Sequence, residues 1–420
     1  MKPGFFIDFP AIQSHLTDSE VDELAYVLRH ARTLSMGPCL KQFEQEFAGY
    51  LGVGYAFGVS SASAALELAA MVTGIREGDE VILPCHTFTA TALPFMRKKA
   101  KLVFADIHPD TWVMDIDDVL RKITPKTKAI VPVHLYGLPV DMCRLGSIAR
   151  QHGITIIEDC AQALGASQNG RKVGTFGTVG CFSFHSQKNI TTLGEGGMIV
   201  TDDETIAEQI LGLRKVGQRP YNNQQSYWEP AMTNVIEAVV GELPFNFALG
   251  EIQACAGYLL LRRLEALNDR RRVLRASIIE SLAHHPEMVF QTIPEDCITS
   301  AHLLPVRIDE ISLCATRNDV IGVLYKEWGI KAVVQYNPLY RYDLFNKHGY
   351  MPDGSCPESD RFYNSMISLP FSPDMNIREF DYLIYAVDNC LQDIKDRQRT
   401  MQIPMTNNRK EMYDCTMQKS

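Results

Sequence analysis

Short apolar runs alternate with helical patterns from residue 55 to residue 201. Seven runs of four to six residues are typical of buried strands, and between most of them apolar residues recur at three- and four-residue spacing. This alternation predicts an α/β fold with a mainly parallel sheet of seven strands, covered by helices on both faces. The seven runs are YAFGV, EVIL, KLVFAD, AIVPV, ITIIED, VGCFSF and GGMIVT.

Two amphipathic segments precede this region. The first, DSEVDELAYVLRHAR, predicts a helix capped by Asp18, within an N-terminal arm that we place at residues 1–36. The second, CLKQFEQEFAGYLG, has apolar residues at helical spacing and ends on Gly52, a residue suited to a helix C-terminus.

The second half of the chain predicts a smaller α+β domain at residues 256–390, after a large domain at 37–255. One long amphipathic helix, 251–282, links the two, and residues 217–233 form a polar segment. HLLPVRI and KAVVQY predict strands, whereas NDVIGVLYKEWG and REFDYLIYAVDNCL predict helices. We expect residues 391–420 to be a loose polar tail.

Composition restricts the partners. The chain has 420 residues, 46% of them hydrophobic, and a formal net charge of -9 without any block of like charges. These values argue against nucleic acid or an anionic membrane as the main partner and leave small molecules. No secretory leader and no membrane-spanning stretch are recognisable, so we expect the protein in the cytoplasm.

Metal and disulfide chemistry have little support in the sequence. The eleven cysteines are scattered without a C-x-x-C pair, and we expect reduced thiols. His284 and His285 are adjacent, and adjacent residues of a helix face different directions. We therefore predict no metal site.

A parallel sheet binds ligands beyond the carboxyl ends of its strands. This rule selects the residues that directly follow the predicted strands as candidates for a site. They are Ser60–Ser63, Pro84–Thr89, His134–Gly137, Asp159–Gln162 and Ser183–Lys188.

The first two groups offer a phosphate seat and a stacking ring. Ala62 and Ser63 follow a strand and open a helix, whose free amides attract phosphate; a plain helix cap is the alternative. Phe88 lies on the loop after EVILP, where its face could stack on a flat ring, although an ordinary buried phenylalanine would give the same pattern.

The last groups offer an amine and a carboxylate. Lys188 lies in a glycine-flanked turn between two apolar runs, in GCFSFHSQKNITTLGEGGMIV, and a solvated surface lysine is the alternative. Asp159 ends an apolar strand, where a buried carboxylate needs a cation or a strong donor unless it merely caps the next helix. A phosphate seat, a stacking ring, a carboxylate and a lysine are together what pyridoxal 5′-phosphate (PLP) requires.

Several longer segments carry a family resemblance. The chain resembles the DegT/DnrJ/EryC1/StrS family of PLP-dependent sugar aminotransferases from about Gly37 to about Asp388. The resemblance implies a fold-type I aminotransferase, a homodimer with active sites at the subunit interface, and Lys188 as the Schiff-base lysine. The matching segments are GDEVILPCHTFTATA, VFADIHPDTWVMD, TPKTKAIVPVHLYGLPVDM, IEDCAQALGA, GCFSFHSQKNITTLGEGGMIVTDD, FNFALGEIQACAG and ISLPFSPDM.

The resemblance also implies roles for single residues. Asp159 would pair with the pyridine nitrogen, Gln162 would hydrogen-bond near the ring hydroxyl, and Ser183 would contact the phosphate. Asn246 in FNF would reach the phosphate of the neighbouring subunit. The amide seat of Ala62 and Ser63 and the ring of Phe88 complete the cofactor contacts that we predict.

The chain departs from the family pattern at a few positions. Ala62-Ser63 replaces the usual Gly-Thr. Three further departures lie on the substrate side. Many members have arginine at the position of Ala248, and histidine at the positions of Val216 and Gln335. Lys188 is retained, which separates the chain from relatives with histidine there that act as dehydratases.

We therefore expect an aminotransferase that moves an amino group from a donor such as L-glutamate to a keto group of a nucleotide-linked sugar. The same family resemblance leaves a cyclitol ketone or an aminobenzoate precursor as the alternative acceptor. A non-catalytic binding protein on the same fold is the third hypothesis.

Overall fold

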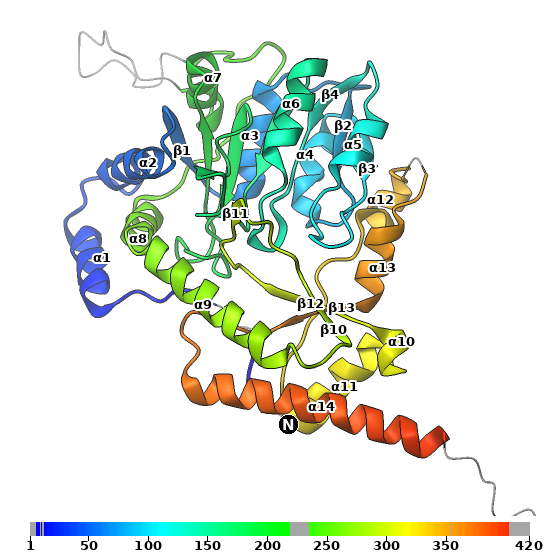
Figure 1. The fold of residues 1–420 in the computed structure, drawn as a ribbon. Coiled ribbons are helices and arrows are strands. Elements are labelled where there is room, and N and C mark those ends of the chain that lie inside the picture. Colours follow the sequence, from blue (N-terminus) through cyan, green and yellow to red (C-terminus); the bar gives the residue numbers. More distant parts are fainter. Residues whose placement is uncertain (1–5, 9, 11, 219–234, 353, 403–420) are drawn as a thin grey trace, which may run out of the picture.

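The computed structural model describes residues 6–8, 10, 12–218, 235–352 and 354–402. A large unit built on one sheet lies above a smaller unit with its own short sheet, and helix α9 crosses between them (Figure 1). Most of the predicted polar segment 217–233 lies outside the described residues. Within them, no helix has the length and apolar character that crossing a membrane requires.

The central sheet has seven strands in the order β1-β9-β8-β5-β4-β2-β3. Only β9 runs antiparallel to its neighbours, which confirms the mainly parallel sheet. The strands are β1 (Tyr55–Val59), β2 (Glu80–Pro84), β3 (Lys101–Ala105), β4 (Thr127–Ile130), β5 (Thr155–Asp159), β8 (Val179–Ser183) and β9 (Gly197–Thr201).

All seven predicted runs coincide with these strands, but β4 begins and ends earlier than AIVPV. Pro132 has no N–H to donate, so the ladder is interrupted there and continues only as a single bridge between Val133 and Asp159.

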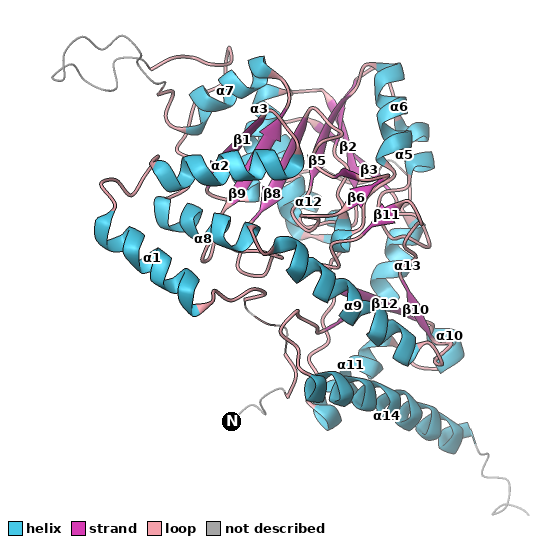
Figure 2. Ribbon diagram, turned by 60° about the vertical axis from the view of Figure 1, so that its left-hand side comes forward, coloured by secondary structure: helices cyan, strands magenta, loops and turns pink. Residues whose placement is uncertain are grey.

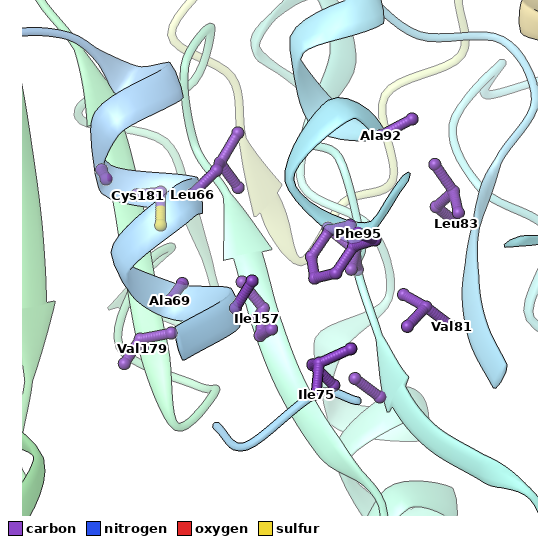
Figure 3. Packing of buried hydrophobic residues seen from close by; sticks show 14 of the residues in the cluster. Leu66, Ala69, Ile75, Val81, Leu83, Ala92, Phe95, Ile157, Val179 and Cys181 are labelled. Atoms are coloured by element: carbon purple, nitrogen blue, oxygen red, sulfur yellow. The ribbon is translucent and has the colours of Figure 1, made fainter. Parts of the chain in front are cut away.

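Helices cover both faces of the sheet. On one face Phe95 of α4 and Ala69 of α3 pack against Val81 and Ile157 of the strands (Figure 3). The other face carries α5 and α6 over one half and α2 and α8 over the other (Figure 2). The helices are α2 (Pro38–Leu51), α3 (Ala62–Val72), α4 (Leu93–Arg97), α5 (Ile116–Lys122), α6 (Met142–His152), α7 (Glu204–Arg214) and α8 (Glu251–Leu261).

Two predictions about helices were wrong in detail. Helix α1 (Asp18–His30) is capped by Thr17, whose hydroxyl accepts from the Glu20 amide, and not by Asp18. The predicted helix 251–282 is two helices, α8 and α9 (Leu264–Leu282), with a break at two arginines. By contrast, α2 ends on Gly52 in the left-handed conformation, as its sequence predicts.

The smaller unit contains an antiparallel sheet of β10 (Met288–Phe290), β12 (Leu304–Ile308) and β13 (Met366–Leu369). The predicted strand 331–336 is absent, because only Val333 bridges to Ser368 before the chain turns toward the large unit. The helices of this part are α10 (Glu310–Leu313), α11 (Arg317–Trp328), α12 (Asp343–Lys347), α13 (Pro357–Ser365) and α14 (Ile377–Gln402).

Helix α14 runs along the outer side of the smaller unit and continues to Gln402. Residues 391–402 are therefore helical and not a loose tail, while 403–420 lie outside the described residues. Short elements complete the structure: β6 (Ser167–Gln168), β7 (Arg171–Lys172), β11 (Cys297–Ile298), η1 (Thr89–Thr91), η2 (Leu135–Gly137) and η3 (Leu339–Arg341).

Candidate active site

Residues from all five predicted strand-end segments line one cavity of about 320 Å³. The cavity lies where the carboxyl ends of the parallel strands meet, as the rule for such sheets requires. Every predicted cofactor contact except Asn246 is among the lining residues, which include Ser61, Ala62, Ser63, Thr87, Phe88, Thr91, Leu135, Asp159, Gln162, Ser183, His185, Lys188, Glu195, Gln335 and Tyr336.

Lys188 follows β8 in a turn whose backbone is held by a hydrogen bond from the Lys188 amide to the His185 carbonyl (2.8 Å). Burial lowers the pKa of its ammonium to about 8, and the negative charges of Asp159 and Glu195 oppose this shift. The side chain therefore differs from the solvated surface lysine that was the alternative. Near neutral pH a usable fraction of it is the free amine.

Asp159 ends β5 and is 4% exposed. One carboxylate oxygen accepts from the Ala161 amide (3.0 Å) and the other from the Thr91 hydroxyl (2.8 Å). Burial raises the pKa of Asp159, whereas these two donors and the positive charge of Lys188 oppose the rise. Lys188 lines the same cavity, and its positive charge acts on this carboxylate, in the direction that the sequence predicts for a buried acid.

The neighbouring acid, Glu158, has a different environment. It is fully buried, and its two carboxylate oxygens accept from the amides of Gly174 (2.7 Å) and Gly177 (2.6 Å). His134 Nε2 lies 3.1 Å from the Gly174-bound oxygen. Glu158 thus fixes a loop, and only Asp159 faces the cavity.

The N-terminus of the eleven-residue helix α3 faces the same cavity. The Ser61 hydroxyl caps it by accepting from the Ala64 amide (3.1 Å). The amides of Ala62 and Ser63 donate to no other group among the described residues, which leaves them free for an anion. Ser61 is therefore the helix cap, and the two amides that follow it remain available, as the predicted phosphate seat requires.

A glycine makes this arrangement possible. A Cβ built on Gly197 of β9 would lie 2.4 Å from the Ser61 carbonyl carbon and 2.7 Å from the Ala62 nitrogen. Any larger residue at position 197 would push the start of α3 away from the sheet.

Gln162 links the two units at the cavity. Its side-chain oxygen accepts from the Tyr136 amide (2.7 Å), and its Nε2 donates to the Tyr336 hydroxyl (3.1 Å). Phe88 is 55% exposed, with its ring 5.7 Å from that of Tyr336. This exposure excludes the ordinary buried phenylalanine that was the alternative.

Ser183 is 9% exposed at the end of β8 and lines the cavity, whereas Asn246 does not. Asn246 lies on the surface in an irregular segment, where its side chain accepts from the Ala248 amide (3.2 Å). A role for Asn246 at a phosphate therefore requires a second subunit.

The sequence patterns did not single out Thr91 and Tyr336, and Tyr136 lies within the selected segment His134–Gly137 without a role having been predicted for it. Thr91 lies two residues past the strand-end segment that was selected, and its partner Thr87 (3.0 Å) lies within that segment. Tyr336 belongs to the run that was assigned to a strand of the smaller unit, so only its position after Gln335 pointed to the site.

These residues fit PLP. Free amides at a helix start, a buried carboxylate, an exposed ring and a lysine with a lowered pKa share one cavity. The buried Oε1 of Gln335, which also lines the cavity, has no partner among the described residues. When bound, PLP supplies an electron-withdrawing ring that carries the amino group between two substrates.

The chain is similar to known aminotransferases in sequence and in structure. The sequence model of the DegT/DnrJ/EryC1/StrS aminotransferase family matches residues 14–388. The chain is 35% identical to a dTDP-3-amino-3,4,6-trideoxy-alpha-D-glucose transaminase of Streptomyces venezuelae, over 88% of this chain and 91% of that enzyme. It is 33% identical to a UDP-N-acetyl-3-dehydro-alpha-D-glucosamine 3-aminotransferase of Acidithiobacillus ferrooxidans, over 88% and 93%.

The fold is also similar to that of DesV from S. venezuelae, solved in complex with a ketimine intermediate. The TM-score is 0.78 and the sequence identity 34%, and the match covers 89% of this chain and 94% of that structure.

Proposed function

Because the chain belongs to the DegT/DnrJ/EryC1/StrS aminotransferase family, we propose that it uses PLP to transfer an amino group from L-glutamate to a keto group of a nucleotide-linked sugar. One observation carries the proposal. Lys188, whose pKa is lowered, lines the same cavity as Asp159 and the free backbone amides at the start of α3. The two relatives named above act on dTDP- and UDP-linked sugars, which supports the same acceptor class here.

In this proposal each residue of the cavity has a distinct task. Lys188 Nζ would attach the cofactor as a Schiff base and, once released as the free amine, would move a proton between the two carbon atoms that exchange the amino group, one in the substrate and one in the cofactor. Asp159, as a carboxylate that accepts from Thr91 and from the Ala161 amide, would lie opposite the ring nitrogen and keep a proton on it. The amides of Ala62 and Ser63, with Ser183, hold the phosphate, and Phe88 covers the ring from the solvent side.

We further propose that two copies of the chain form the working enzyme, with Asn246 of each completing the site of the other. Around Asn246 the surface is apolar: Leu243 is 83% exposed and Phe245 is 67% exposed. Exposed apolar patches of this kind mark interaction surfaces.

We place the reaction in the cytoplasm. All ten cysteines of the described residues are free, which suits a reducing compartment.

A labelling experiment tests the proposed function. The purified PLP-loaded protein is incubated with ¹⁵N-glutamate and with keto sugars linked to dTDP or UDP, and the products are analysed by mass spectrometry. Label in the sugar nucleotide supports the proposal, and Lys188→Ala is the control that should transfer none. Parallel incubations contain a cyclitol ketone or an aminobenzoate precursor in place of the sugar nucleotide, and label only in their aminated products would favour the alternative acceptor class. Failure to convert glutamate at all would favour a binding protein.

A further inference from the structure

Two histidines and an aspartate meet on the smaller unit, outside the cavity described above. His284 and His285 follow the C-terminal end of α9, and Asp388 lies in α14, which packs against that end (Figures 1 and 2). One ligand atom from each of the three residues lies within 4.8 Å of the others.

The two histidines do not belong to a helix, in which neighbouring side chains would diverge as the sequence pattern predicts. Helix α9 ends at Leu282, and in the turn that follows the two imidazole centroids lie 4.0 Å apart. Adjacent residues in a turn can therefore direct their rings to the same point.

Neighbouring acceptors fix the orientation of both rings. His284 Nδ1 donates to the Ser281 carbonyl (3.0 Å), and His285 Nδ1 lies 3.4 Å from a carboxylate oxygen of Glu287. Glu287 is 2% exposed and pairs with Lys395 (2.5 Å), so it is held in place. A carbonyl bonded to His284 Nδ1 and a carboxylate close to His285 Nδ1 turn both Nε2 atoms to the opposite side, an arrangement seen behind most metal-bound histidines.

Both Nε2 atoms face Asp388. The distances to its Oδ1 are 2.8 Å from His285 and 3.4 Å from His284. With each ring proton on Nδ1, two nitrogen lone pairs and a carboxylate oxygen converge on one point, which is the donor set of a bound cation. Without a cation, a proton on His285 Nε2 bridges the 2.8 Å to Asp388, and a metal ion that binds takes the place of this proton.

We propose that His284, His285 and Asp388 bind one divalent transition-metal ion of the zinc class. Two imidazole nitrogens and one carboxylate oxygen suit such ions, and water completes the coordination. The site is open to solvent, since His284 is 59% exposed and Asp388 is 35% exposed at the side chain. The bound ion ties the end of α9 to α14 and stabilises the smaller unit, whether or not the proposed transamination takes place.

Titration of the full-length, PLP-loaded chain with Zn²⁺ after chelator treatment tests the site. Isothermal titration calorimetry should show one equivalent bound, and the melting temperature should rise with Zn²⁺. His284→Ala removes an exposed side chain and should fold, yet it should weaken binding at least tenfold and abolish the thermal shift. Asp388→Asn should act in the same direction.

Two further measurements separate this site from other zinc ligands. His348→Ala removes an exposed histidine of the same unit and should leave the affinity unchanged. X-ray absorption at the zinc edge should show nitrogen and oxygen ligands. Absence of saturable binding, equal affinity in His284→Ala, or sulfur ligands from exposed Cys143 or Cys314 would each overturn the proposal.

Discussion

At the residue scale, two adjacent acids at the end of β5 have opposite tasks. Successive side chains of a strand point to opposite sides, so Glu158 and Asp159 cannot share an environment. Glu158 meets fixed backbone amides on one side, while Asp159 meets a rotatable hydroxyl and a lysine on the other. Replacing each carboxylate by its amide should therefore change kcat in the case of Asp159 and the free energy of unfolding in the case of Glu158.

Asp159→Asn should reduce catalysis and leave the fold intact. The Thr91 hydroxyl can rotate to accept from the new amide, and no charge remains to be desolvated. Without a charge opposite the cofactor, we expect kcat to fall at least ~100-fold, the size of effect found when one electrostatic contact is lost. Steady-state kinetics and a melting curve measure the two quantities. A variant with normal kcat would contradict the assigned role of Asp159.

Glu158→Gln should do the reverse. Whichever way the amide is turned, its NH₂ group faces the N–H of Gly174 or Gly177, and neither can rotate away. A buried donor without an acceptor costs about 1–3 kcal/mol, which chemical denaturation would detect. The kcat per folded molecule should stay close to that of the wild type. An unchanged free energy of unfolding would show that the carboxylate is not needed there.

The pH dependence of cofactor attachment should report the lowered pKa of Lys188. Only the free amine is nucleophilic, and the pKa is lowered to about 8 by burial. Starting from cofactor-free protein, the rate of PLP attachment should rise about tenfold per pH unit below pH 8 and level off above it. Stopped-flow absorbance measures this rate, with Lys188→Arg as the inert control. A profile still rising toward pH 10 would show an ordinary solvated lysine.

At the scale of elements, the local sequence pattern was sufficient to locate a strand or a helix end where the pattern was unambiguous. The seven strands are short, apolar and bounded by polar turns, so the sequence located all of them, with β4 the only marked shift. The helix end at Gly52 was also recognisable, since its left-handed conformation requires a residue such as glycine.

Elements that depend on distant partners could not be predicted. No glycine or proline marks the break between α8 and α9, but Arg262 pairs with Glu46 of α2 and Arg263 with Glu20 of α1. The run 331–336 has strand composition, yet Tyr336 turns to reach Gln162 of the other unit. In both places, contacts between residues that are far apart in the sequence override the local preference for a helix or a strand. The same holds for the turn that brings His284 and His285 together.

The start of α3 depends on a glycine in another element. Gly197→Ala should displace the Ser61–Ala62 backbone, because its Cβ would lie within 2.7 Å of main-chain atoms that cannot rotate away. We expect PLP to bind at least tenfold more weakly, measured by fluorescence titration.

The control for this change is Gly49→Ala in α2, where a Cβ meets nothing within 4 Å. This variant should bind PLP normally and gain about 0.5–1 kcal/mol of stability, the usual helix preference of alanine over glycine. Normal PLP affinity in Gly197→Ala would mean that the amide seat tolerates displacement.

At the scale of the whole molecule, both units contribute residues to the cavity. The large unit supplies Lys188, Asp159 and the amides of α3, and the smaller unit supplies Gln335 and Tyr336. Phe88 remains exposed, and the surface around Asn246 is apolar. A second copy of the chain would cover apolar surface and bring an asparagine to the cavity.

Mixing two inactive variants tests this arrangement. Co-expression of Lys188→Ala and Asn246→Ala with different tags should, for the proposed dimer, give mixed dimers in which one site has Lys188 from one subunit and Asn246 from the other. If the sites are shared, these mixed dimers recover up to about half of the wild-type activity per dimer, because one of two symmetric sites is complete. The control pairs Lys188→Ala with Asp159→Asn. Both residues line the cavity of one chain, so no site is restored and no activity should return. Equal behaviour of the two pairs, or full activity of Asn246→Ala alone, would place Asn246 outside the active site.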